Sequence, residues 1–230
     1  AKVVYIIKDN ELADSVHEGD RVNVVLDVSP FYAESGGQVG DTGVIEWGDG
    51  LLKVEDTQKT SDGKYLHSGI IEKGVLQTGM SVKASVDTKR RRAIERNHTT
   101  THLIHRALRN ILGNHVDQAG SFVGPDRLRF DFTHFSAMSP SEIERVEDEV
   151  NQKILDDLTV SANEMDINEA KKLGATALFN EKYDSIVRVI SIDNYSMELC
   201  GGTHLNSTSQ AGLVKIVSEN GVAAGTRRIE

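Results

Sequence analysis

The chain has 230 residues, of which 38% are hydrophobic and 27% charged, as is ordinary for one large or two small globular domains. Acidic residues outnumber basic ones by 35 to 26, and the net charge of −9 argues against a dedicated nucleic-acid-binding protein. No apolar run approaches the ~20 residues that cross a bilayer, so no membrane partner is expected. The single cysteine excludes an internal disulfide and favours a cytoplasmic location.

Residues 1–88 have the pattern of an all-β domain. Short alternating runs are separated by turn signals such as Gly48-Asp-Gly50 and Ser61-Asp-Gly63. Several short strands at this spacing predict a small barrel or sandwich. The expected strands are Val3–Ile7, Arg21–Val28, Val44–Trp47, Leu51–Asp56, Tyr65–Ile71 and Ser81–Asp87.

From Lys89 the hydrophobic spacing becomes helical, and it predicts a long helix that ends at Gly113-Asn114. A second helix is expected to begin at a capping box that Ser139 and Glu142 form, and to run to about Leu158.

The rest of residues 89–230 alternates strands with one short helix near Ile167–Leu173, which predicts an α+β domain. The expected strands are Gly120–Val123, Arg127–Phe132, Val160–Met165, Ile186–Ile192 and Leu213–Glu219. A glycine-bearing turn around Cys200 is expected between the last two of these strands.

Two short motifs carry residues suited to binding a metal ion: His98-Thr-Thr-Thr-His102 and Cys200-Gly-Gly-Thr-His204. Four-residue spacing on a helix places both histidines of the first motif on one face. Each motif is a weak signal alone, since a lone cysteine is more often a buried small hydrophobe. Together they supply the four His and Cys ligands of a tetrahedral zinc site.

Other histidines compete less well for this role. His105 lies one turn beyond His102, but it would leave His98 unused, so we expect it to pack beside the site. The remaining histidines have no motif partner and are expected to be structural or at the surface: His17, His67, His115 and His134.

Basic residues cluster despite the acidic average, at Lys89–Arg92, at Arg127 and Arg129, and at Arg227-Arg228. Solvated surface is the simplest interpretation of any one of them, yet together they could hold a phosphodiester. The chain does not start with methionine and ends abruptly, so it is expected to be a fragment of a longer protein.

Six segments resemble the editing domain of alanyl-tRNA synthetases and the free-standing AlaX trans-editing proteins. They are FYAESGGQVGDTG (31–43), RNHTTTHL (96–103), QAGS (118–121), PDRLRFDF (125–132), CGGTH (200–204) and GVAAGTRRI (221–229). They follow the family's order and cover nearly the whole chain. Threonyl-tRNA synthetases share the second additional domain but are a poorer match over residues 1–88.

The resemblance implies a small β-barrel (1–88) packed on an α+β zinc-binding editing domain (89–230). The implied activity is hydrolysis of the ester in tRNA(Ala) mischarged with serine or glycine. The parent enzyme would ligate alanine to tRNA(Ala) with ATP. Its aminoacylation and C-terminal domains are absent here, so this chain is not expected to aminoacylate.

The resemblance also assigns roles to residues. His98, His102, Cys200 and His204 would bind zinc, and Thr101 would contact the serine hydroxyl. Gln118 would hold the aminoacyl ester or a water molecule, and Gly36, Gly37 and Gln38 would approach the substrate from the barrel.

Three interpretations remain open from the residues themselves. No Ser-His-Asp spacing or G-x-S-x-G motif is present, so metal-assisted ester hydrolysis is favoured over an acyl-enzyme. Four protein ligands are, however, typical of a structural zinc in a non-catalytic RNA-binding module. A zinc hydrolase acting on a small ester is the third interpretation. For Thr101, a helix threonine bonded to its own turn remains the simpler alternative to a substrate contact.

Overall fold

The structure is a computed structural model that describes residues 1–177 and 184–230, and these fold into two compact units. Unit 1 comprises residues 1–35 and 39–91, whereas unit 2 comprises residues 36–38 and 92–230. A long helix, α1 (Thr88–Leu112), begins in unit 1 and continues through unit 2. Within the described part of the chain, no helix is both long and apolar enough to span a membrane.

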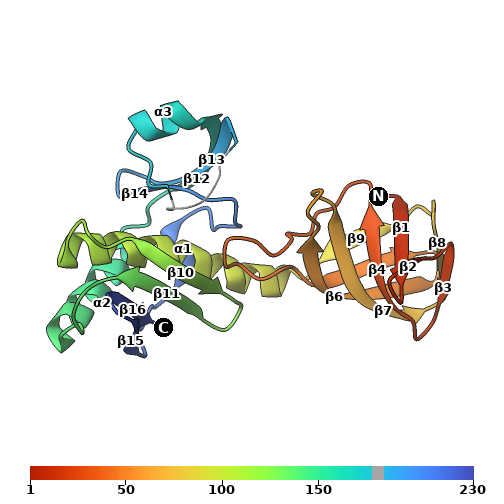
Figure 1. Ribbon diagram of the computed structural model, residues 1–230, viewed down its shortest axis with the longest axis horizontal. Coiled ribbons are helices and arrows are strands. Elements are labelled where there is room, and N and C mark those ends of the chain that lie inside the picture. Colours follow the sequence, from red (N-terminus) through yellow and green to blue (C-terminus); the bar gives the residue numbers. More distant parts are fainter. Residues whose placement is uncertain (178–183) are drawn as a thin grey trace. The chain divides into compact units, whose positions relative to one another are not determined.

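Unit 1 is built from antiparallel strands (Figure 1). One sheet has the order β2-β1-β4-β7-β6-β5-β9, and β3 pairs with β8 separately. The strands are β1 (Val3–Lys8), β2 (Glu11–Leu12), β3 (Ser15–His17), β4 (Arg21–Leu26), β5 (Gly43–Trp47), β6 (Gly50–Lys59), β7 (Tyr65–Lys73), β8 (Val75–Gln77) and β9 (Lys83–Val86). The six expected strands correspond to β1, β4, β5, β6, β7 and β9; β2, β3 and β8 are too short to show a period.

No continuous ladder closes these strands into the predicted barrel within the described residues. The strand order ends at β2 on one side and β9 on the other. The chain just before β9 meets the start of β1 through an isolated bridge between Lys2 and Ser81 and a backbone hydrogen bond from Val3 to Met80 (2.9 Å). Gly79 turns the chain there with φ of +86°, which interrupts the regular pairing. The sheet therefore curls around its core without closing completely.

The core of unit 1 is apolar and follows the alternation of its strands. In β6, for example, Leu52 and Val54 are buried and the intervening Lys53 is exposed. The largest side chains that are fully buried here are Ile6, Phe31, Ile45, Leu52, Ile71 and Leu76.

Unit 2 is a mixed α+β domain with antiparallel sheets, which confirms the α+β prediction. One sheet has the order β10-β11-β16-β15, and the other has the order β12-β13-β14. The strands are β10 (Gln118–Val123), β11 (Leu128–Thr133), β12 (Val160–Asp166), β13 (Ile186–Ile192), β14 (Ser196–Leu199), β15 (Glu219–Ala223) and β16 (Thr226–Ile229). The helices are α1, α2 (Pro140–Leu155), α3 (Ile167–Lys172) and the short 3-10 helix η1 (Thr208–Ala211).

Helix α2 begins at the predicted capping box. The Ser139 side chain accepts a hydrogen bond from the Glu142 N–H, and the Glu142 carboxylate accepts one from the Ser139 N–H (2.7 Å). The helix ends at Leu155, three residues before the predicted end, because the backbone turns at Asp157, where φ is +52°.

The predicted strand Leu213–Glu219 is wrong. Its first half bonds to side chains of α2, whereas Val217 and Ser218 bond to the backbone of Glu230 and Glu219 already belongs to β15. The N–H and C=O of Val214 both pair with the Asn151 amide (2.9 Å each), and the Ile216 N–H donates to Glu147 (2.6 Å). The last strands are β15 and β16, and the Cys200 turn follows β14, which the sequence did not indicate.

Strand β13, in the middle of the sheet β12-β13-β14, packs against apolar residues on both faces. Val187 and Val189 of β13 pack with α3, whereas Ile190 and Ile192 join the main core with α1, α2 and β11. Glu198 of β14 lies opposite Ile190 in the ladder, so it shares the face that looks toward the main core. This register carries a carboxylate to the side of the sheet where α1 lies.

Candidate metal centre

The histidines of α1 form one stripe along the helix. His98, His102 and His105 follow each other at four and three residues, which keeps them on one face. All three side chains are buried, with exposed fractions of 7%, 6% and 2%. They are buried because β14 and the Cys200 turn contact this face of the helix.

The second motif forms a tight turn directly after β14. The Arg188 guanidinium, from β13, donates to the carbonyl oxygens of Cys200 (3.0 Å) and Gly202 (2.6 Å). A side chain at Gly202 would overlap the His98 ring. Glycine at this position therefore lets the turn approach α1 closely enough to bring both motifs together.

The four predicted ligands form one cluster that could hold a metal ion. Their donor atoms all lie within 4.8 Å of one another. The Cys200 Sγ is 3.4 Å from Nε2 of His98 and 3.3 Å from Nε2 of His204. Tetrahedral ligands at zinc bond lengths would be separated by about 3.5 Å, so the two distances from the Cys200 sulfur match the spacing that such an ion requires.

A buried nitrogen without a partner also indicates a missing ligand. The His102 Nε2 is buried and, in the described structure, has no hydrogen-bond partner. Such an atom is costly in an apolar interior unless an ion or a water molecule pairs with it. The set of three imidazoles and one thiolate is one that zinc prefers.

Each cluster histidine directs its other ring nitrogen to a protein oxygen. Nδ1 of His98 is 2.6 Å from Oε1 of Gln38, and Nδ1 of His102 is 3.0 Å from Glu198. Nδ1 of His204 is 3.3 Å from the Thr99 hydroxyl. Metal-binding histidines usually have such an outer partner, because it orients the ring and leaves the other nitrogen for the metal.

Glu198 contacts two histidines at once. Its second oxygen lies 3.0 Å from Nδ1 of His105, which therefore stays outside the four-residue cluster. His102 and His105 hold the pKa of Glu198 below its ordinary value even though burial opposes this. The carboxylate is consequently ionised and accepts a hydrogen bond from each ring.

Cys200 and His204 have the protonation states in which they can bind a metal ion. Burial raises the pKa of Cys200, but the adjacent histidines, His98 foremost, hold it well below its ordinary value. Burial and the neighbouring His98 lower the pKa of His204 to about 3. A thiolate and a neutral imidazole are the metal-binding forms of these side chains.

The other predicted site residues are all in unit 2. The Thr101 hydroxyl donates to the carbonyl of Asn97, one turn earlier on α1 (2.9 Å). Gln118 begins β10 opposite Phe132, whose side chain is buried in the main core. Gly37 has φ of +84°, and a side chain there would lie 2.5 Å from the Ser121 carbonyl oxygen.

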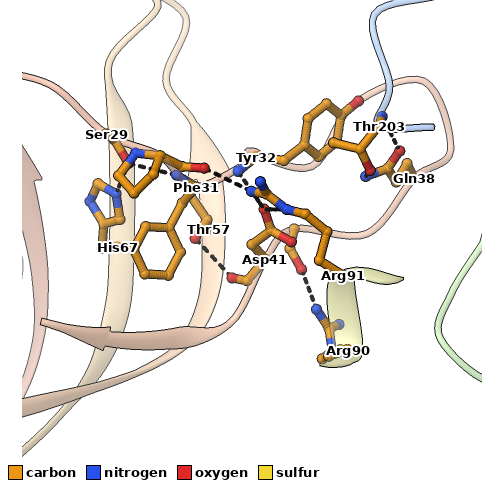
Figure 2. Close-up of polar contacts among 12 residues, drawn as sticks. Ser29, Phe31, Tyr32, Gln38, Asp41, Thr57, His67, Arg90, Arg91 and Thr203 are labelled. Carbon is orange, nitrogen blue, oxygen red and sulfur yellow. Dashed lines mark hydrogen bonds and ion pairs between the residues drawn. The ribbon is translucent and has the colours of Figure 1, made fainter. Parts of the chain in front are cut away.

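Unit 1 holds the two ends of the segment that carries residues 36–38. Figure 2 shows the buried Asp41 carboxylate, which accepts hydrogen bonds from the Tyr32 N–H (2.7 Å) and the Arg91 guanidinium. The Asp41 N–H in turn donates to the Tyr32 carbonyl (2.9 Å), and Thr57 donates to the Asp41 carbonyl (2.9 Å). This arrangement fixes the base of the loop between Tyr32 and Asp41.

Several residues of the basic clusters form ion pairs within the protein. Arg91 pairs with Asp41, Arg92 with Glu95, Arg227 with Glu219 and Arg228 with Asp131. These partners reduce the charge available to a phosphate. Arg127 is exposed and lies in the turn between β10 and β11, so it is better placed to meet a ligand in solution.

Some residues around the cluster were not predicted from the sequence. Glu198 stands two residues before Cys200. In an extended segment this spacing puts both side chains on the same side, and it was the only sequence feature that linked Glu198 to the metal motif. No sequence feature indicated the roles of Thr99 and Thr203, because these roles depend on contacts with side chains elsewhere in the fold.

Comparisons with known proteins match the whole chain to part of longer enzymes. Residues 1–90 match the family "tRNA synthetases class II (A)", and residues 187–230 match the "Threonyl and Alanyl tRNA synthetase second additional domain". The chain is 66% identical over 230 residues to the alanine–tRNA ligase of Acetivibrio thermocellus. It is 50% identical to that of Bacillus velezensis and 53% identical to that of a Thermoanaerobacter species.

Each alignment covers 100% of this chain but only 26% of the relative. Both family matches agree with these relatives, and the match over residues 187–230 includes Cys200 and His204 of the cluster. The chain therefore corresponds over its whole length to a segment of the alanine–tRNA ligases, and it is about a quarter as long as these relatives.

Proposed function

We propose that this segment is the editing domain of an alanine–tRNA ligase. It would hydrolyse the ester of tRNA(Ala) mischarged with serine or glycine, in a parent enzyme that ligates alanine to tRNA(Ala) with ATP. The observation that carries the proposal is the cluster of His98, His102, Cys200 and His204, whose donor atoms converge while the three Nδ1 atoms face outer oxygens. The resemblance of the sequence to the editing domain of alanyl-tRNA synthetases supports a β domain at residues 1–88 and a deacylase domain at residues 89–230.

Zinc suits the cluster, and when bound it supplies a positive charge that polarises an oxygen of the substrate or of a water molecule. The protein's own residues prepare the site for it. The turn at Cys200 supplies the thiolate, and Glu198 keeps the Nδ1 proton of His102 on the side away from the cluster. Burial of His98 and His102 limits the access of bulk water to their side of the site, which strengthens the electrostatic interactions of a reacting ester.

Thr101 is proposed to recognise the serine hydroxyl. Its own proton is donated to Asn97, so its oxygen keeps lone pairs that can accept a hydrogen bond from an incoming hydroxyl. A pocket for alanine cannot reject glycine strongly, because a missing methylene group is worth only about 1–3 kcal/mol. A separate site that binds the hydroxyl of serine would hydrolyse Ser-tRNA(Ala) and leave Ala-tRNA(Ala) intact.

Gln118 is proposed to hold the aminoacyl ester or the attacking water. Gln118 is half-buried at the start of β10. It pairs with Phe132 of β11, so both side chains lie on the same face of the sheet. A glutamine there offers both a donor and an acceptor to an ester.

The direct test is deacylation of Ser-tRNA(Ala) and Gly-tRNA(Ala), with Ala-tRNA(Ala) as the matched substrate. We expect the zinc-loaded chain to hydrolyse the two mischarged substrates selectively, and Cys200→Ala to abolish the activity. A Thr101→Val variant should hydrolyse Ser-tRNA(Ala) more slowly but should still bind zinc. Full activity and full discrimination in that variant would exclude the role of Thr101.

The four-ligand cluster also supports a second candidate function, a structural zinc in an RNA-binding module. Four protein ligands leave no coordination position for a water molecule. If the zinc-loaded chain and a full-length relative both bind tRNA(Ala) but hydrolyse no ester, the structural role is correct and the editing proposal fails. Hydrolysis of small esters without tRNA would instead indicate a small-molecule hydrolase.

The proposed RNA contact can be tested at Arg127. The exposed side chain allows Arg127→Glu without loss of an internal ion pair that the structure shows. If it contacts a phosphate, the variant should bind tRNA(Ala) more weakly and with a smaller salt dependence, by about one counterion. An unchanged salt dependence would leave Arg127 as solvated surface.

A further inference from the structure

Gln38 is buried completely, with an exposed fraction of 0%, although it lies in a loop segment far from the metal motifs in sequence. It belongs to unit 2 together with Gly36 and Gly37. Its side chain contacts both motifs, since Oε1 is 2.6 Å from Nδ1 of His98. The amide also bonds Thr203 in the Cys200 turn, as Figure 2 shows.

The hydrogen bonds of this amide determine its orientation. The backbone N–H of Thr203 donates to Oε1 (2.9 Å), while Nε2 donates to the Thr203 hydroxyl (2.9 Å). The atom that faces the Thr203 N–H must be an acceptor, so it is the amide oxygen. The same oxygen faces Nδ1 of His98, and Nδ1 must therefore carry the proton.

We infer that Gln38 is a positioning residue of the metal centre. By accepting the Nδ1 proton of His98, it leaves Nε2 unprotonated and directed at the Cys200 thiolate and the ion. By bonding Thr203 twice, it also holds the turn that carries Cys200 and His204. The inference rests on the metal-binding part of the proposed function, but it does not depend on which ester the site hydrolyses.

Steric constraints make this arrangement specific. The positive φ of Gly37 and its close approach to the Ser121 carbonyl allow the tip of the loop to enter the site. A side chain at Gly202 would overlap both the His98 ring and the Gln38 oxygen. Because its oxygen already accepts two hydrogen bonds and its nitrogen donates one, Gln38 has little capacity left to bind substrate.

The experiment measures zinc affinity by competition with a chelator, together with the absorption spectrum of the cobalt-substituted protein. Gln38→Met keeps the volume but removes the acceptor, and we expect it to weaken zinc binding 10- to 100-fold, the usual effect of losing an outer partner. It should also change the cobalt spectrum, because the His98 ring is no longer oriented. Gln38→Glu keeps an acceptor at the same place and should bind zinc within about threefold of the parent chain.

Two further variants keep the test decisive. Gln152→Met alters an exposed glutamine of α2 that donates a hydrogen bond to Asp156, and it should leave zinc affinity unchanged. Thr203→Val removes one of the bonds that hold Gln38 and should weaken zinc binding less than Gln38→Met does, so it tests the same contact if Gln38→Met folds poorly.

The outcomes separate this inference from the proposed function. Parent-like affinity and cobalt spectrum in both Gln38→Met and Thr203→Val would overturn the positioning role while leaving the metal centre intact. A parent chain that does not bind zinc would overturn the metal centre itself, and the positioning role with it. If Gln38→Met loses zinc affinity and Gln38→Glu retains it, the positioning role of Gln38 is established.

Discussion

Both units contain a completely or almost completely buried histidine, but the surroundings of the two rings differ. In unit 1, Nδ1 of His67 is 2.8 Å from the Val24 carbonyl and Nε2 is 2.6 Å from the Ser29 hydroxyl (Figure 2). In unit 2, Nδ1 of His102 meets Glu198, whereas its Nε2 has no partner in the described structure.

The comparison shows that burial alone does not distinguish a structural histidine from a ligand. A carbonyl can only accept, so Nδ1 of His67 donates to it and Nε2 accepts from Ser29, which leaves the ring satisfied. The His102 ring is satisfied on one side only, and three more donor atoms converge on the open side. The convergence of metal-binding atoms around a buried nitrogen that lacks a partner, and not the presence of a histidine, therefore indicates the metal centre.

The largest expected effect comes from removing the metal. At a zinc concentration about a thousandfold above the dissociation constant, binding should stabilise unit 2 by about 4 kcal/mol. Chelation should therefore speed amide hydrogen exchange in α1 and β14 and leave β5 and β6 of unit 1 unchanged. Cys200→Ala should abolish the difference, and an equal response in both units would contradict the comparison.

A large effect confined to unit 1 is expected from Asp41→Ala. The substitution leaves the guanidinium of Arg91 without its buried carboxylate and removes an acceptor for the Tyr32 N–H. Loss of one member of a buried ion pair costs about 3–5 kcal/mol, and partial exposure of Arg91 places this case at the lower end. Urea denaturation measures the cost; a decrease of less than about 1 kcal/mol would show that the pair contributes little.

The pH dependence of unit 1 tests whether His67 is neutral. Burial lowers the pKa of His67 in the folded protein below its ordinary value of 6.5. The unfolded chain then binds more protons, so the free energy of unfolding of unit 1 should fall as the pH decreases through 6.5 toward the lowered pKa. Amide hydrogen exchange in β4 and β7 between pH 7.5 and 5 would measure it.

The control for this pH effect is His67→Leu, which removes the titrating group. The variant should be less stable by about 1–3 kcal/mol, because the Val24 carbonyl loses its side-chain donor, but its pH dependence should be flatter. A parent-like pH dependence in His67→Leu would assign the effect to another group.

The smallest effect is expected from Ser139→Ala, a change in unit 2 outside the metal centre. The substitution removes the side-chain acceptor for the Glu142 N–H and should cost about 1 kcal/mol. Thermal unfolding measures the loss, and zinc affinity should not change. A lower zinc affinity would show that the metal centre responds to any destabilisation of unit 2, and not only to its own contacts.

Local patterns in the sequence were sufficient for most elements. The helical period predicted α1, the capping box predicted the start of α2, and the two motifs brought together the four residues that cluster in the structure. These features depend on residues close together in the chain, whose spacing reflects helix geometry or a side chain bonding to its own turn. The strand predicted at Leu213–Glu219 failed in its first half because the backbone partners of Val214 and Ile216 are side chains of α2, which no local pattern encodes.

The sequence by itself determined which side chains could bind a metal, because their chemistry and spacing are local properties. Only the tertiary structure decided how they are held. Glu198 reaches His102 through the register of β14, and Gln38 reaches His98 from a segment 60 residues away. The physical reason is that a buried imidazole needs a partner for each nitrogen, and the fold as a whole determines which oxygen occupies that position.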